Sequence, residues 1–252
     1  MVNADSNVAL KQVIDSEHRS DQNKKRDIYR HPLETLDFFE VDPNMSVIEI
    51  WPGGKAWYTE ILAPYLKDNG ILYAAHFSAD AKVPYFAKNR QQFNDKVSAQ
   101  PEYYGNINVT VLQPPHSLEI APKASVDRVL TFRNVHNWMK NGQVNAVFNA
   151  MYKALKPGGI LGVVEHRAIA SSEQDPKALS GYVTEAYVIA LAKKAGFKLL
   201  DKSEINANPK DTTDYVKGVW TLPPSLRLKG QEKEKYLAIG ESDRMTLKFI
   251  KK

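Results

Sequence analysis

The stretch VIEIWPGGKAWYTEILAPYL, from Val47 to Leu66, decides the fold that this sequence predicts. With Ser46, its first residues form a short apolar run, which is typical of a buried strand over 46–50. Pro52-Gly53-Gly54 follow as a turn, and Ala56 to Leu66 then carry apolar residues at helical spacing. A strand, a glycine turn and a helix in this order begin a βαβ unit.

The rest of the chain continues this alternation. Apolar runs predict further strands, and helical spacing predicts helices between them. The predicted strands are 71–76, 107–112, 126–132, 160–165, 197–205 and 245–250, and the predicted helices are 8–20, 82–93, 143–155 and 182–195. Strands separated by helices of this length favour an α/β fold with a mostly parallel sheet.

Length and composition bound the organisation of the chain. It has 252 residues, of which 43% are apolar and 25% charged, as in ordinary globular proteins. We expect a helical N-terminal segment over 1–40, able to act as a lid, and one α/β domain over 41–252. A loop-rich stretch over 206–240 interrupts the pattern, and loops of that length are usually functional or disordered.

Several classes of protein are excluded or disfavoured by residue counts. The chain has no cysteine, which excludes a disulfide scaffold, a thiolate metal site and a cysteine nucleophile. The 34 Lys and Arg against 29 Asp and Glu give a net charge of +5, but the two signs alternate along the chain, so no nucleic-acid partner is expected. No apolar run approaches the ~20 residues that a membrane span needs.

The sequence leaves the cellular location open. Residues 1–27 are polar and contain no apolar core of a signal peptide. The chain therefore suits a cytoplasmic protein, or a periplasmic protein from which a leader has been removed. The absence of cysteine fits both compartments equally, and the oligomeric state is open as well.

The glycine turn after the first strand is the first candidate binding site. Ligands of open α/β sheets sit at the carboxyl ends of the strands, near the point where the strand order reverses. Gly53 and Gly54 permit close approach of a ligand to the backbone, and the next helix offers free N–H groups. Glu49 can accept hydrogen bonds from an amine or a hydroxyl. A plain tight turn is the alternative interpretation.

Polar side chains follow the fourth strand in the stretch FRNVHNW, from Phe132 to Trp138. Arg133 is able to bind a carboxylate or a phosphate, and Asn134 is able to orient a polar substrate. His136 is a candidate base near neutral pH, and Trp138 is a candidate for stacking on a ring or a cation. The alternative is a packed loop, with Trp138 in the core and Arg133 in a local ion pair.

Two further segments carry candidate substrate-binding residues. Glu165 and His166 end the fifth strand, where the alternative is a solvated strand exit. Tyr29, Arg30 and His31 precede a proline and could fold over the sheet edge as a lid. The alternative for this segment is a helix end with polar decoration, because the residue before a proline disfavours helix.

The long loop and the histidines complete the set of candidates. Residues 208–211 and Trp220 could form the far wall of a substrate site. The histidines at 31, 76, 136 and 166 show no HxxxH or HExxH spacing, so no metal site is expected.

Three motifs resemble the class I S-adenosylmethionine-dependent methyltransferases. The first is the stretch from Val47 to Leu66, with an acidic residue at the strand end, glycines and then a helix. SVDRVLTFRNVHNW (Ser125 to Trp138) and ALKPGGILGVVEH (Ala154 to His166) are similar to the fourth-strand and fifth-strand motifs. The resemblance covers about 45–200. It implies a Rossmann-like, doubly wound, seven-stranded and mostly parallel sheet with its last strand antiparallel.

A narrower resemblance runs over nearly the whole chain. RDIYRHPLETLDFF, FRNVHNWM and NPKDTTDYVKGVWTLPPSLR look like a bacterial group known only as predicted methyltransferases, many of which carry a secretory leader.

The resemblance also implies roles for the candidate residues. S-adenosylmethionine, converted to S-adenosylhomocysteine, would lie against Glu49, Trp51, Pro52, Gly53, Gly54, His76 and Arg133. A small-molecule acceptor would be held and activated by Tyr58, Asn134 and His136, with Tyr29, Arg30, His31, Trp138, Glu165 and His166 around the substrate.

The sequence departs from the family pattern at the cofactor motifs. Trp51 and Lys55 stand where the family commonly has glycine. The second strand ends in Ala75-His76-Phe77 rather than in the acidic residue that binds ribose hydroxyls, and the third strand end also lacks an acid. Three hypotheses follow: a methyltransferase, a protein of the same fold that binds another small ligand without turnover, and an enzyme of another class.

Overall fold

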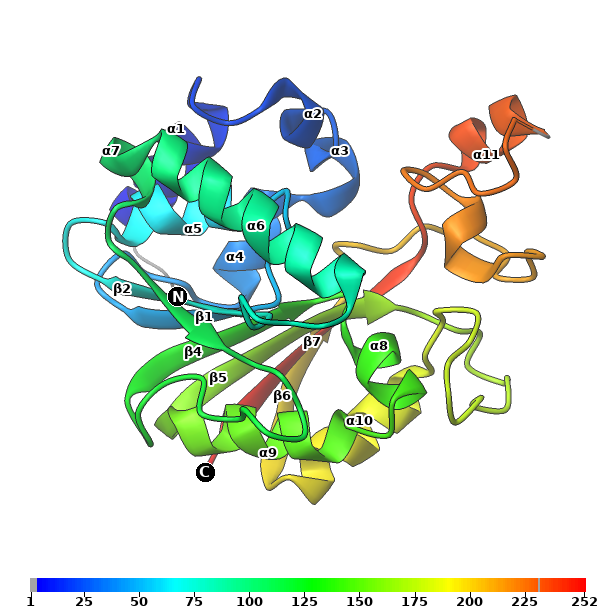
Figure 1. Ribbon diagram of the computed structural model, residues 1–252. Helices are drawn as coiled ribbons and strands as arrows, with labels where there is room; N and C mark the ends of the chain where they lie inside the picture. The colour runs from blue at the N-terminus through cyan, green and yellow to red at the C-terminus, as the bar shows by residue number, and fades with distance from the viewer. Residues whose placement is uncertain (1–3, 231) are drawn as a thin grey trace.

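Seven strands form one sheet in the computed structural model of the chain, which describes residues 4–230 and 232–252 (Figure 1). The strands are β1 Ser46–Ile50, β2 Ile71–His76, β3 Ile107–Val111, β4 Val126–Phe132, β5 Leu155–His166, β6 Phe197–Ser203 and β7 Arg244–Lys251. Their order across the sheet is β3-β2-β1-β4-β5-β7-β6.

The strand directions create a crevice at one edge of the sheet. β1 pairs in parallel with both β2 and β4, and β7 lies antiparallel between β5 and β6. After β1 the chain turns toward β2, and after β4 it turns toward β5, so the strand order reverses between these two neighbours. Connections that leave in opposite directions uncover the carboxyl ends of both strands, which is where open α/β sheets bind ligands.

Helices cover both faces of the sheet (Figure 1). One face carries α1 Ala4–Asp15, α2 Asp21–Lys24, α3 Asp27–Arg30, α4 Pro32–Phe38, α5 Thr59–Leu66, α6 Pro84–Ala99 and α7 Pro101–Tyr104, and the other carries α8 Val135–Lys140, α9 Val144–Ala154 and α10 Glu185–Lys194. The 3₁₀ turn η1 (Gly218–Thr221) and α11 (Lys233–Ile239) lie beyond the strand ends, in the segment that joins β6 to β7.

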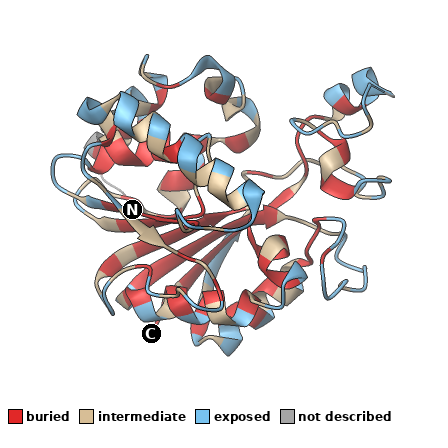
Figure 2. Cartoon of the chain, viewed as in Figure 1, coloured by how far each residue is buried: buried red, intermediate tan, exposed pale blue. Residues whose placement is uncertain are grey.

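The core lies on both sides of the sheet, because successive side chains of a strand point to opposite faces. Val47 and Leu130 pack with the helices α1, α4 and α5, whereas Ile48 and Val129 pack with α8, α9 and α10. Figure 2 shows the strands as the most continuously buried part of the chain, while α6 and α11 expose their outer faces. Strands buried on both faces explain why the sequence shows near-continuous apolar runs.

The structure confirms the predicted fold class and differs from the predictions mainly at element ends. The helix after the glycine turn begins at Thr59 rather than at 56, because Ala56 has a φ of 49° and belongs to the turn. The first helix spans 4–15 rather than 8–20. β5 begins early, at Leu155, because Leu155 pairs with Val126 before the Pro-Gly-Gly turn. The stretch 206–240 contains η1 and α11.

Within the described residues, no helix is both long enough and apolar enough to cross a membrane.

A substitution at one glycine of β5 can test how tightly Phe39, which directly follows α4, packs on the sheet. Gly162 lies in the middle of β5, and a Cβ atom there would stand 2.8 Å from Phe39 and from Leu130. We expect Gly162→Ala to lower the free energy of unfolding by about 1–3 kcal/mol, because overpacking a rigid core forces neighbours aside. Chemical denaturation measures the change. The exposed strand residue Lys198 serves as control, since Lys198→Ala should change it by less than about 0.5 kcal/mol. An equal effect of the two variants would contradict this packing.

Candidate functional site

A large cavity opens at the carboxyl edge of the sheet, where the strand order reverses. Its volume is about 950 Å³, within the usual range for small-molecule sites. The lining comes from the turns after β1, β2, β4 and β5 and from the long loop. It comprises Trp51, Pro52, Gly53, Phe77, Tyr85, Phe86, Phe132, Arg133, Asn134, His136, Asn137, Lys140, Asn141, His166, Leu179, Ser180, Tyr215, Val216, Lys217, Gly218, Trp220 and Arg227.

The two glycines of the turn have different roles. Gly53 brings its backbone to the cavity, whereas Gly54 packs against α6. Gly53 has a φ of +70° and lines the cavity, and a Cβ atom there would meet only Asn89 Oδ1, at an ordinary contact distance of 3.8 Å. Gly54 does not line the cavity. Its N–H donates to Asn89 Oδ1, and a Cβ atom there would clash with Gln92 on α6. Gly54 therefore holds the turn against α6.

An aromatic wall stands beside the turn. Trp51 adopts a φ of 47°, a left-handed conformation that a bulky residue rarely takes, and its Nε1 donates to the carbonyl of Leu112 at 2.9 Å. Its ring lies 4.7 Å from the ring of Phe77, which stacks in turn on Phe86 at 4.3 Å. These rings come from the ends of β1 and β2 and from the first turn of α6. They form an apolar wall, with the rings of Trp51 and Phe77 tilted by 48°, against which a planar ring can pack.

A buried carboxylate orients the histidine after β4. Glu165 is fully buried, and its Oε1 lies 3.0 Å from Nδ1 of His136. The backbone N–H groups of Val135 and His166 also donate to this carboxylate. An ionised carboxylate only accepts hydrogen bonds, so Nδ1 of His136 carries the proton and its Nε2 has the free lone pair. His136 lines the cavity, which gives the site an oriented base.

A second histidine lies next to this pair. The ring of His166 stands 5.4 Å from that of His136, and its Nδ1 is 2.5 Å from Ser242 Oγ. Burial and the neighbouring His136 and Arg133 hold the pKa of His166 well below its usual value, so it stays neutral. His136, Glu165 and His166 are also close enough to be metal ligands. Because both Glu165 oxygens already accept hydrogen bonds, the geometry favours a hydrogen-bonded dyad.

Arg133 and Asn134 follow β4 in very different ways. Asn134 Nδ2 donates to the carbonyl of Ile50 at 3.0 Å, which ties the end of β4 to the end of β1. Arg133 has a φ of 62° and lines the cavity, and its side chain has no hydrogen-bond or ion-pair partner among the residues that the structure describes. One side chain therefore fixes the edge of the site, and the other remains available to a ligand.

The long loop supplies the far wall of the cavity. Trp220 and Arg227 pack together, with the guanidinium 4.8 Å from the ring centroid. Lys217 and Tyr215 line the same wall. Trp220 is a predicted wall residue, whereas its neighbours are not, although the basic residues that flank this tryptophan in the sequence are a usable signal. Residues 208–211 do not line this cavity, and Asp211 borders a different one.

Three predicted cofactor contacts lie outside the cavity lining. Gly54 packs on α6, as described above. Glu49 is buried, and its Oε2 accepts a hydrogen bond from Thr59 Oγ1, while burial raises the pKa of Glu49 to about 7. His76 is fully buried against Phe93, and its Nδ1 accepts the N–H of Phe77. The predicted cofactor contact of His76 is not seen in the lining of this cavity, because the ring of His76 packs in the core.

Two aromatic residues expected at the substrate are also core residues. Trp138 is fully buried and packs edge-on against Trp51 at 5.6 Å. Tyr58 is buried and stacks on Phe132 at 3.5 Å, beneath the cavity. Helix and sheet close over these large rings because burying them stabilises the fold. Neither side chain lines the cavity. The prediction that Tyr58 and Trp138 contact a substrate directly is therefore not supported by the structure.

The remaining predicted substrate residues do not line the cavity. Glu165 acts beneath His136. Tyr29 and Arg30 belong to α3, and His31, with a φ of 40°, joins α3 to α4. Arg30 is buried over the ring of Trp57, at 4.6 Å, rather than in the cavity.

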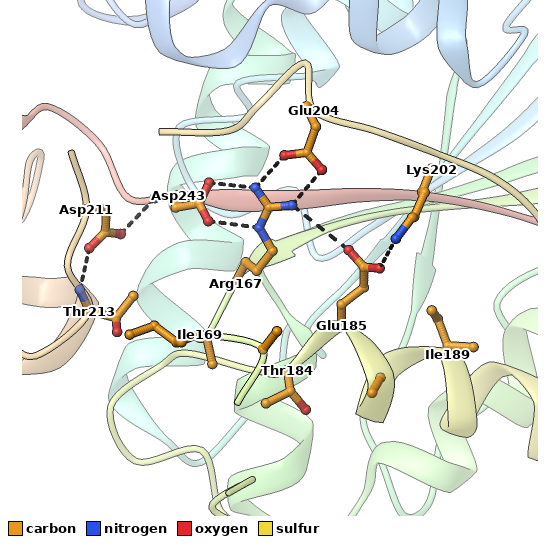
Figure 3. Close-up of a pocket in the computed structure, with 13 residues that line it drawn as sticks. Arg167, Ile169, Thr184, Glu185, Ile189, Lys202, Glu204, Asp211, Thr213 and Asp243 are labelled. Carbon is orange, nitrogen blue, oxygen red and sulfur yellow. Dashed lines mark hydrogen bonds and ion pairs between the residues drawn. The ribbon is translucent and has the colours of Figure 1, made fainter. Parts of the chain in front are cut away.

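A second cavity lies on the other side of the long loop, and its charges are paired with one another. Arg167 donates to Asp243 and Glu204, and Glu185 stands 3.9 Å away (Figure 3). Lys202 binds the other oxygen of Glu185. In Figure 3 the side chains converge on Arg167 rather than on the open space, which indicates an ion network that joins β5, β6 and β7.

Comparison with protein-family models gives no match, and comparison with curated protein sequences gives none either. Many solved structures are similar in fold. A SAM-dependent methyltransferase from Aquifex aeolicus has a TM-score of 0.54 and 16% identity, over 79% of this chain and 93% of its own. The chain has the class I methyltransferase fold.

Two further structures with this fold differ in what their names state. Phosphoethanolamine N-methyltransferase 2 from Haemonchus contortus, solved with S-adenosyl-L-methionine, has a TM-score of 0.54 and 14% identity, over 88% of this chain. The chain spans 52% of that protein. The cyclase SpnF has a TM-score of 0.55 and 15% identity, over 94% of this chain and 85% of its own. The class I methyltransferase fold thus also occurs in a protein named for another reaction.

The buried histidine at the end of β2 gives a pH-dependent stability. Burial lowers the pKa of His76 to about 4, whereas an unfolded histidine titrates near 6.5. Its neutral form therefore favours the folded state, and this contribution is complete above pH 6.5 and is lost as pH falls toward 4. The loss amounts to about 3 kcal/mol.

His76→Asn tests this assignment, because an asparagine oxygen can still accept the N–H of Phe77 but does not titrate. We expect the difference in unfolding free energy between neutral and mildly acidic pH to shrink in this variant. Urea denaturation at the two pH values measures it. The same pH dependence in wild type and variant would show that His76 does not titrate in this way.

Proposed function

We propose that the protein transfers a methyl group from S-adenosylmethionine to a nucleophilic oxygen or nitrogen of a small molecule. The observation that supports it is one cavity at the reversal of strand order, which joins the Gly53 turn to the base His136. The similar structures named as SAM-dependent methyltransferases support the cofactor class.

The glycine turn and the aromatic wall, on the side of the cavity formed by the ends of β1 and β2, fit S-adenosylmethionine. Gly53 has no side chain and lines the cavity, which suits the close approach of an amino-acid or ribose chain, and Trp51, Phe77 and Phe86 offer a surface for the adenine ring. The lining contains no carboxylate for the ribose hydroxyls. Ribose recognition would therefore depend on backbone groups and on the Oδ1 atom of Asn134, whose Nδ2 is bound to the carbonyl of Ile50.

Bound S-adenosylmethionine would supply an electrophilic methyl group. The chain's own residues must then align the acceptor and remove its proton. His136 lines the cavity, and its Nε2 can take that proton, while Glu165 stabilises the resulting imidazolium through Nδ1. Trp220, whose ring lies 5.9 Å from that of His136, limits the access of water from the far side. Alignment in such a cavity supplies much of the rate of a displacement reaction.

A second candidate function is the binding of a different small ligand without methyl transfer. The missing carboxylates at the ends of β2 and β3 favour it, because the ribose loses its usual partner there. The two candidates differ in one measurable property, which is the affinity for S-adenosylmethionine.

Calorimetric titration with S-adenosylmethionine and S-adenosylhomocysteine tests the proposed cofactor. We expect binding in the micromolar range, and we expect Gly53→Val to abolish it, because the added side chain enters the cavity. Gly158→Val is a matched control, since Gly158 also has a positive φ and open surroundings but lies on the exposed turn of β5. Absence of binding at millimolar ligand would count against methyl transfer and in favour of the second candidate.

Variants of the dyad test the proposed base once an acceptor is identified. His136→Asn keeps a donor for Glu165 but removes the basic nitrogen, and we expect turnover to fall by about 10²–10⁴-fold. Glu165→Gln should also lower turnover, because it favours the wrong tautomer of His136. The exposed residue His116 provides the control variant His116→Asn. Wild-type turnover in His136→Asn would remove His136 from the mechanism.

A further inference from the structure

The charged residues that line the large cavity all have the same sign. Arg133, Lys140, Lys217 and Arg227 line it, and no aspartate or glutamate does. These cations come from three separate segments: the turn after β4, the end of α8 and the long loop. Cavities lined by charges of one sign concentrate ligands of the opposite sign.

A buried arginine cluster lies directly behind Arg133. Arg26, Arg30 and Arg244 share a single carboxylate, Glu241, at 2.5 Å, 3.6 Å and 3.4 Å. Arg30 is almost fully buried, and its Nε and Nη1 atoms have no hydrogen-bond partner. Arg133 and Arg26 also line a smaller cavity of about 190 Å³ next to the large one. The positive charge therefore extends from the cavity wall into the interior.

The acidic groups of this region do not balance the cluster. Glu241 is shared among three guanidinium groups. Glu165 accepts hydrogen bonds from His136 and two backbone N–H groups, and Glu49 is buried with Thr59. The side chain of Arg133 has no partner of its own in the described part of the chain. Uncompensated cations at a buried site favour the binding of an anion, because the anion removes their mutual repulsion.

The second cavity shows the opposite arrangement (Figure 3). There a single arginine, Arg167, contacts Asp243, Glu204 and Glu185. Arg167, which joins neighbouring segments of this protein, is therefore surrounded by carboxylates that balance its charge. The unpaired state of Arg133 is a property of the large cavity.

We propose that the large cavity binds its small-molecule substrate through an anionic group, a carboxylate or a phosphate, held by Arg133 with Lys217 and Arg227. The planar guanidinium can bind two oxygens of such a group side by side. The nucleophilic end of the same molecule then lies toward His136. This inference rests on the proposed function in one respect, which is that the anionic molecule is taken to be the methyl acceptor. The anion site itself does not depend on methyl transfer.

Binding of inorganic phosphate and of citrate, measured by thermal shift and calorimetry at constant ionic strength, tests the anion site. We expect millimolar or tighter binding of at least one probe to the wild-type protein. Arg133→Gln should weaken it by about tenfold or more, since a charge-assisted hydrogen-bond pair is lost. Lys153→Gln removes an exposed positive charge on α9, away from the cavity, and should leave binding unchanged.

The outcomes separate this inference from the proposed function. Equal binding by wild type and Arg133→Gln, or no binding of either probe, would overturn the anion site. Displacement of the bound anion by saturating S-adenosylhomocysteine would overturn its assignment to the acceptor, because the site would then serve the cofactor's carboxylate. Simultaneous binding of both supports the acceptor assignment. If S-adenosylhomocysteine does not bind, the proposed cofactor fails while the phosphate and citrate titrations still decide the anion site.

Discussion

The reversal of strand order between β1 and β4 is the constraint on which the rest of the site depends. Because the chain leaves these neighbours in opposite directions, no connection covers their carboxyl ends. The hydrogen bond from Asn134 to the carbonyl of Ile50 joins the two ends and fixes the width of the gap. The glycine turn, the His136 dyad and the aromatic wall all reach the cavity from this one edge.

Buried charge is the second organising feature of the molecule, and the structure treats it in two ways. Glu165 lies near the end of β5 and Arg167 directly follows this strand, and each is held by fixed partners, so both act as internal links. Arg133 and the cluster behind it retain an excess of positive charge. Buried charges without partners reduce stability, so their retention at a cavity wall is the pattern expected of a ligand site rather than of a structural link.

The sequence alone allowed the strands, the fold class and the region of the site to be predicted. Apolar runs locate all seven strands, and the turn after the first strand places Trp51, Pro52 and Gly53 at the sheet edge. Side-chain direction was not predictable in the same way. Trp138 sits in a helix whose first residues line the cavity, and the rotation of that helix turns its ring into the core. His76 was likewise expected at the edge, but its ring packs against Phe93.

The sequence by itself determined the order of strands and helices, because local periodicity and glycine turns are properties of neighbouring residues. It also determined which polar residues follow which strand. Only the tertiary structure decided that Glu165 orients His136, that the side chain of Arg133 has no partner in the described chain, and that Lys217 and Arg227 face the same cavity. These relations join residues tens of positions apart, and the packing of the whole sheet brings them within contact distance.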